Sequence, residues 1–379
     1  MYMYDFQRLK NWMDNVCAKG AAPGCDVLIY REHEQIFRYI TGTADLEKTK
    51  PLTDKAAYYL YSCSKPITVT GAMLLVQRGQ LELDAPVGNY LPAFRDAFVV
   101  ENGEKICVGE EMTVRHLFTM SAGLDYQLDR PAVRALLARK PDASTLEVVS
   151  AFAQDPLLFR PGERYEYSLC HDVLGAVIES VSGMRFGDFL RENIFAPLGM
   201  EHTCFAKKGE VPDNMVEQYR YWGENGMDQV DGNGNIFVFN RDYQSGGAGL
   251  ISTTEDYARF ADAMACGGCG ANGARILEEK TVEQMRTEQL HKLLKNPAFC
   301  CSAGPGYSYG LGVRVLTDRS DGQRSSLGEF GWDGAAGAYL LCDPLSHLSI
   351  VYMQHVQNWP DPLEMHAPVR DLTYDIMDL

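Results

Sequence analysis

Segments typical of β-strands lie near both ends of this chain, and segments typical of helices fill its middle. Residues 24–41 form two alternating apolar and polar runs joined at a polar turn, the pattern of a strand pair. Further strand-like runs follow near the C-terminus, at 308–316, 336–342 and 347–354. One sheet built from both ends of the chain, with a helical region inserted between them, fits this order. The order therefore predicts an α+β fold.

The clearest helix signal is in residues 62–79, where apolar side chains recur at helical spacing. Ser62 is a possible N-cap, and Gly79 stands where a helix would end. Other helix-like segments are 113–121, 132–139, 172–182 and 254–266.

Length, composition and charge narrow the class of protein. The chain has 379 residues, of which 46% are apolar and 23% charged, which suits one large domain or two lobes. The formal net charge of -16 repels phosphate backbones and anionic lipids. The sequence therefore predicts neither a nucleic-acid partner nor a membrane partner, and it leaves the oligomeric state open.

Cysteine content and targeting signals bear on the compartment. The eleven cysteines are an odd number spread along the chain, unlike the disulfide framework of a small secreted protein. Asp5, Arg8 and Lys10 interrupt any apolar run at the N-terminus, and no stretch approaches the roughly 18 apolar residues of a membrane span. We therefore expect a cytoplasmic protein with reduced thiols.

Ser62 and Lys65 form a Ser-x-x-Lys pair at the start of the predicted helix. A serine hydroxyl is a poor nucleophile until a base takes its proton, and residues three apart on a helix share a face. Lys65 can therefore present its amine to the Ser62 oxygen, and burial would move the lysine toward its neutral, basic form. The same spacing also arises by chance, with Ser62 as a helix cap and Lys65 as a solvated lysine.

The surrounding sequence resembles the serine β-lactamase and penicillin-binding protein superfamily. The pair is followed by a helix and then by LELDAPVGNYLPAF (81–94). Five further segments match in the expected order: TVRHLFTMSAGL (113–124), PGERYEYSLCHDVLGAVIESVSG (161–183), IFAPLGM (194–200), SGGAGLISTTEDYARFADAM (245–264) and FGWDGAAGAYLLCDP (330–344). The motifs are most similar to the class C β-lactamase-like branch, which includes the family VIII carboxylesterases.

The resemblance implies a β-lactamase/transpeptidase-like fold, with an antiparallel sheet flanked by helices and an inserted, mostly helical lobe. Residues 1–81 and 245–379 would form the lobe that carries the sheet, and residues 82–244 the helical lobe. The active site would lie in the cleft between the lobes, with Ser62 at its floor.

Tyr167 and Leu169 match the first and third positions of the second family motif, Tyr-x-Asn. The resemblance implies that Tyr167 lies beside Ser62, where a phenol needs nearby positive charge to act as a base. Lys65 would supply that charge, and the two residues would share the serine proton. The resemblance also implies that Leu169 lies at the substrate, in place of an asparagine that contacts the substrate amide, although leucine has no polar atom for that contact.

Residues 332–334, Trp-Asp-Gly, match the third motif, which is Lys-Thr-Gly in β-lactamases. Trp332 offers an indole donor and no charge where the family's lysine attracts a carboxylate, as in the Trp-x-Gly of family VIII esterases. Gly334 would let substrate lie close against the strand. The resemblance also implies that the backbone N–H groups of Ser62 and Ala335 hold the oxyanion. Composition alone indicates only a turn and a strand here.

Two other motifs predict no additional chemistry. Ser308 lies in a Gly-x-Ser-x-Gly sequence, but a strand-like run follows it where a nucleophile elbow needs a helix. Cys266 and Cys269 form a single Cys-x-x-Cys pair, and no second pair lies at zinc spacing. We therefore expect no metal and no cofactor.

The resemblance implies a serine hydrolase that forms an acyl-enzyme. Because Leu169 and Trp332 stand in place of residues that read β-lactams, we expect a carboxylesterase acting on a small ester or amide, with short-acyl esters preferred. The alternatives are a β-lactamase or D-amino-acid peptidase, and a non-catalytic ligand-binding protein on the same fold. The sequence leaves the natural substrate open.

Overall fold

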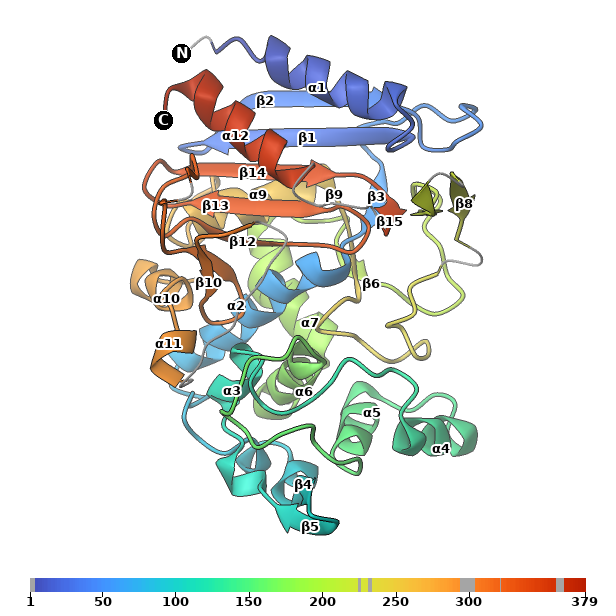
Figure 1. The fold of residues 1–379 in the computed structure, drawn as a ribbon, viewed down its shortest axis with the longest axis vertical. Coiled ribbons are helices and arrows are strands. Elements are labelled where there is room, and N and C mark those ends of the chain that lie inside the picture. Colours follow the sequence, from blue (N-terminus) through green and yellow to red (C-terminus); the bar gives the residue numbers. More distant parts are fainter. Residues whose placement is uncertain (1–3, 224–225, 231–233, 294–303, 321, 359–364) are drawn as a thin grey trace.

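A seven-stranded antiparallel sheet joins the two ends of the chain (Figure 1). The computed structural model describes residues 4–223, 226–230, 234–293, 304–320, 322–358 and 365–379. The strand order is β10-β11-β12-β13-β14-β1-β2, and the strands are β1 (Gly24–Arg31), β2 (Glu34–Gly42), β10 (Tyr307–Tyr309), β11 (Arg314–Leu316), β12 (Phe330–Asp333), β13 (Tyr339–Asp343) and β14 (Leu348–Met353). β1 pairs with β14 from Asp26↔Met353 to Arg31↔Leu348. The predicted sheet formed by both ends of the chain is therefore confirmed.

Helices cover both faces of this sheet. α1 (Gln7–Ala18) and α12 (His366–Met377) pack on one face, where Leu9, Met13 and Val369 meet the buried side chains of β1, β13 and β14. α9 (Thr254–Ala265) and α2 (Ser64–Gln77) pack on the other face. The apolar side chains of the strands alternate between the two cores, as a period of two requires.

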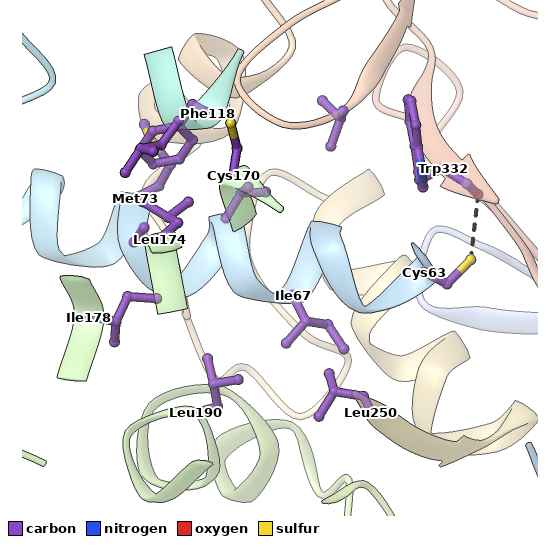
Figure 2. Close-up of a cluster of buried hydrophobic side chains, with 14 of the residues drawn as sticks. Cys63, Ile67, Met73, Phe118, Cys170, Leu174, Ile178, Leu190, Leu250 and Trp332 are labelled. Atoms are coloured by element: carbon purple, nitrogen blue, oxygen red, sulfur yellow. Dashed lines mark hydrogen bonds between the residues drawn. The ribbon is translucent and has the colours of Figure 1, made fainter. Parts of the chain in front are cut away.

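The middle of the chain supplies most of the remaining helices. The core side chains of α2 and α6 lie close together, as Figure 2 shows for Met73, Leu174 and Ile178. Gly71 permits close packing of α7 on α2, because a Cβ there would lie 2.8 Å from Leu190 Cδ2. The helices of this region are α3 (Val114–Phe118), α4 (Pro131–Arg139), α5 (Thr145–Phe152), α6 (Cys170–Ser182), α7 (Phe186–Leu190) and α8 (Ala196–Leu198), and α10 (Glu279–Met285) and α11 (Leu290–Leu293) follow later.

Three small sheets complete the described structure. One of them holds the segment before α2 in place, because β3 pairs with β9 on the side opposite β6. The strands are β3 (Ala57–Tyr59), β9 (Leu250–Thr253) and β6 (Cys204–Phe205); β15 (Val356–Gln357), β7 (Tyr219–Tyr221) and β8 (Met227–Gln229); and β4 (Phe98–Glu101) and β5 (Glu104–Cys107). The boundary between a sheet lobe and a helical lobe stays a prediction.

Two local predictions were wrong. Residues 308–316 form two antiparallel strands, β10 and β11, because the chain turns at Gly312, whose φ of 80° is left-handed. Ser62 caps no helix, because α2 begins at Ser64 and a 3₁₀ turn over Tyr61–Cys63 precedes it. The predicted end of this helix is confirmed, since Gly79 follows it with a φ of 69°. Among the helices described, none combines the length and apolar character that a membrane crossing needs.

Candidate active site

Ser62 and Lys65 lie at the junction between the 3₁₀ turn and α2, with their side chains in contact. The Lys65 amine donates to the Ser62 hydroxyl oxygen at 3.2 Å, so the predicted pairing of these two residues is present. Ser62 is half-buried, whereas the lysine is fully buried. A nucleophile with a basic side chain in hydrogen-bond contact is the arrangement that acyl-transfer chemistry requires.

The residue before Ser62 holds a conformation that non-glycine residues rarely adopt. Tyr61 has a left-handed φ of 46°, a geometry that costs on the order of 1–3 kcal/mol. Its buried phenol donates to Gln218 at 2.5 Å and accepts from Gln357 at 2.8 Å. These bonds anchor the strained turn, and the turn sets the direction of the Ser62 side chain.

Lys65 donates three hydrogen bonds inside the protein. Besides Ser62, its amine reaches the Tyr126 hydroxyl at 3.2 Å and the Gly247 carbonyl oxygen at 2.8 Å. Burial lowers the pKa of Lys65 to about 7, and the carboxylate of Asp172 opposes that shift. A large fraction of the lysine is therefore a neutral base near neutral pH, without losing its position beside Ser62.

Tyr167 approaches Ser62 from the segment that leads into α6. Its hydroxyl donates to the Ser62 hydroxyl oxygen at 2.6 Å, as the family motif implied. Burial raises the pKa of Tyr167 above its ordinary value, although its hydrogen bonds with Ser62 and Trp332 act to lower it. The phenol is therefore protonated in the free enzyme. It can donate a proton during the reaction, and Lys65 is then the group that acts as the base.

Trp332 lies on the other side of Tyr167. The two rings stack with their centroids 5.8 Å apart, and the indole N–H donates to the Tyr167 hydroxyl at 3.3 Å. The residue that replaces the lysine of the third motif thus contacts the phenol directly. Figure 2 shows Trp332 beside the start of α2, where the Cys63 thiol donates to its carbonyl oxygen at 3.7 Å.

Gly334 follows β12 and lies against the segment before the nucleophile. A Cβ at this position would be 2.3 Å from the Leu60 carbonyl oxygen, so the strand end can approach the Ser62 turn only with glycine here. The expected reason for this glycine was access for substrate, and the described contact is instead with backbone. Ala335 comes next and is exposed at the turn. Its role in holding an oxyanion stays a prediction.

The residues after Tyr167 lie deeper than expected. Leu169 is 1% exposed and packs in the core. Its predicted contact with substrate stays a prediction. His171 and Asp172, at the start of α6, are both buried. Burial lowers the pKa of His171 to about 3 and keeps it neutral. Burial raises the pKa of Asp172, which accepts a hydrogen bond from Tyr243 at 2.7 Å.

Tyr126 is the site residue that the sequence analysis missed. It accepts from Lys65 at 3.2 Å, and its ring stacks on the Tyr167 ring with centroids 5.3 Å apart. The edge of Phe237 meets the same ring, with centroids 5.3 Å apart. Its position in the sequence could have indicated a role in the site, because Tyr126 lies two residues after the segment 113–124 that carried the family resemblance.

Ser308 lies in β10, and its hydroxyl donates to Glu288 at 2.9 Å. It therefore lies on a strand and not at a strand-to-helix elbow, as the sequence indicated.

Comparisons with known proteins agree with this geometry. The family model described as Beta-lactamase matches residues 9–375. Esterase EstB of Burkholderia gladioli is 28% identical over 97% of this chain and 94% of its own length. A putative D-alanyl-D-alanine carboxypeptidase of Salmonella paratyphi B is 26% identical over 91% of this chain and 81% of its own. The solved structure of EstCE1, a hydrolase with promiscuous acyltransferase activity, is 26% identical in sequence and superposes with a TM-score of 0.78. The match covers 97% of this chain and 98% of the EstCE1 chain.

Proposed function

Because this chain belongs to the β-lactamase family and is a serine hydrolase, we propose that it is a carboxylesterase that acts on small, short-acyl esters through an acyl-enzyme on Ser62. The observation that carries this proposal is the contact of Trp332 with Tyr167. An uncharged indole occupies the motif position from which a lysine would attract the carboxylate of a β-lactam or peptide. The site therefore favours neutral esters over anionic amides. The names of EstB and EstCE1 support the same class of reaction.

Lys65 begins the reaction as the base. Its neutral amine takes the proton of Ser62 while the serine oxygen forms a bond to the ester carbonyl carbon. The carbonyl oxygen becomes an oxyanion, and the backbone N–H groups of Ser62 and Ala335 are the proposed donors to it. The start of α2 adds the favourable end of a helix dipole beside this charge.

Tyr167 then supplies the proton that the leaving alcohol needs. Its phenol gives up its hydrogen as the carbon–oxygen bond of the ester breaks, and the acyl group stays on Ser62. The proton on Lys65 then returns to Tyr167, and Tyr126 lies beside both residues because it accepts from Lys65 and stacks on the Tyr167 ring. Water then attacks the acyl-enzyme, with the neutral lysine again as base, and the acid and free Ser62 are released.

Aromatic rings form the described walls around the nucleophile. Tyr126, Tyr167 and Trp332 stand in a stacked row, and Phe237 meets the first of them edge-on. Such rings bind small apolar acyl groups by contact. We therefore expect acetate and butyrate esters to be better substrates than dodecanoate esters.

A β-lactamase or D-amino-acid peptidase is the second candidate, because the same nucleophile and base would serve it. The carboxypeptidase relative favours this reading, whereas Leu169 and Trp332 argue against it because neither offers the polar atom or charge that reads such substrates.

The test compares p-nitrophenyl acetate, p-nitrophenyl butyrate and nitrocefin on the wild type and on two serine variants. Ser62→Ala should lower ester kcat/KM at least about 10³-fold, because no other group replaces the nucleophile. Ser308→Ala is the matched control, since Ser308 sits in the other serine motif, and it should retain activity. Equal ester rates in the wild type and Ser62→Ala would refute the mechanism. Nitrocefin turnover as fast as ester turnover would favour the second candidate.

A further inference from the structure

A cluster of three metal-ligating side chains lies at the turn of the β1–β2 hairpin, against the end of α9. His33 comes from the turn, Asp262 from α9, and Cys266 from the residue that follows the helix. The His33 Nδ1 atom is 2.8 Å from Asp262 Oδ2, and the Cys266 Sγ atom is 3.8 Å from Asp262 Oδ1. One ligand atom from each residue lies within 4.8 Å of the others.

The backbone fixes the position of all three side chains. Glu32 and His33 both have left-handed φ angles, 51° and 68°, which is unusual for two consecutive residues other than glycine. This tight turn directs the His33 ring onto α9. Asp262 and Cys266 are four residues apart and therefore share one face of the helix end.

We propose that His33, Asp262 and Cys266 bind a divalent transition-metal ion, and that the ligand set suits Zn²⁺. Imidazole nitrogen, carboxylate oxygen and thiolate sulfur are the three donor types of protein zinc sites. The metal would stand between the three side chains, in place of the hydrogen bonds that now join them. Cys266 would lose its thiol proton when the metal binds.

The surroundings leave room for a further ligand. His33 and Asp262 border a surface cavity of about 470 Å³, from which water can complete the coordination. Cys269 is another candidate, because two glycines with left-handed φ angles, Gly267 and Gly268, turn the chain back toward Cys266. Its half-buried thiol is in no disulfide and donates to the Gly270 carbonyl at 3.8 Å, and its backbone N–H donates to the Cys266 carbonyl at 3.4 Å.

The nearby Arg259 side chain forms its hydrogen bonds outside the His33–Asp262–Cys266 cluster. Arg259 borders the same cavity, but its guanidinium donates to the Gly199 carbonyl and to Glu255. The Cys266–Cys269 pair alone predicted no zinc site, because no second cysteine pair lies at zinc spacing. The fold supplies the missing histidine from a strand turn more than two hundred residues earlier. None of these residues belongs to the Ser62 site, so the metal would have a structural role.

The test is a titration of the full-length protein, freed of metal by a chelator, with Co²⁺ and then Zn²⁺. Co²⁺ bound to a thiolate gives a charge-transfer absorption band. We expect the band to saturate at one equivalent, to vanish when Zn²⁺ displaces Co²⁺, and to be absent in Cys266→Ser. Cys107→Ser, which changes an exposed cysteine in β5, is the matched control and should keep the band.

His33→Gln is the second variant, and it should weaken Co²⁺ binding at least about tenfold because one ligand is lost. Far-UV circular dichroism of each variant reports whether the fold is intact. A wild type without the band, or a folded Cys266→Ser variant with an unchanged band, would overturn the proposal. Both outcomes are independent of the esterase reaction at Ser62.

Discussion

The buried carboxylate of Asp172 controls the base strength of Lys65, and the variant Asp172→Asn tests this control. A Cβ placed on Gly247 would lie 2.5 Å from Asp172 Oδ2 and 3.4 Å from Lys65 Nζ, so these two atoms are at most 5.9 Å apart. At an effective dielectric constant of about 20, a charge pair at that separation is worth roughly 3 kcal/mol, or about two pH units. The attraction holds the proton on Lys65, so its removal lowers the lysine pKa.

The assay is the pH dependence of kcat/KM for a neutral ester. The reaction needs neutral Lys65, so kcat/KM of the wild type should rise with pH and level off above an apparent pKa of about 7. In Asp172→Asn the rising part of this pH profile should move to lower pH, by about two units. The matched control is Asp256→Asn, which changes another buried carboxylate, one bonded to His202 and Thr203. If the pH dependence of kcat/KM in Asp172→Asn is unchanged, or moves to higher pH, the reasoning is refuted.

Three further changes follow from the same contacts. Trp332→Phe keeps an aromatic ring against Tyr167 but removes the indole donor, so kcat/KM for p-nitrophenyl acetate should fall about tenfold. Tyr126→Phe removes the hydroxyl that accepts a hydrogen bond from Lys65, and we expect kcat to fall about 10²-fold with KM little changed. Lys65→Met should abolish esterase activity and raise stability at pH 7. Because the folded pKa of Lys65 lies below its ordinary 10.5, the wild type gains stability as pH rises from 7 to 10.5, by at most about 5 kcal/mol. The gap between the two proteins in urea unfolding should therefore narrow over that range, and a constant gap would contradict the lysine assignment.

Much of the fold was predictable from local patterns. Alternating segments at both ends of the chain predicted the strand pair of residues 24–41 and the sheet that unites the termini, because side-chain period depends only on local sequence. The division of residues 308–316 into two strands was missed. Gly312 lies against Val69 of α2, and sequence alone does not give that contact.

The site residues that belong to family motifs were predictable from the sequence. The residues that only tertiary packing brings to the site were not. Ser62, Lys65 and Tyr167 meet as the family motifs implied. Tyr126 was missed because no motif includes it, and only the fold brings its ring beside Tyr167. The burial of Asp172 was also not predictable from the sequence, because a charged residue near a helix start is more often exposed than buried.

The central claim is that Ser62 carries the acyl group. Its most direct test is to label the protein with a fluorophosphonate probe and to locate the modified peptide by mass spectrometry. We predict one adduct, on the peptide that contains Ser62, in both the wild type and Ser308→Ala, and no adduct in Ser62→Ala. A wild-type protein that resists the probe would favour a non-catalytic binding protein on this fold, and an adduct on Ser308 would contradict the assigned nucleophile.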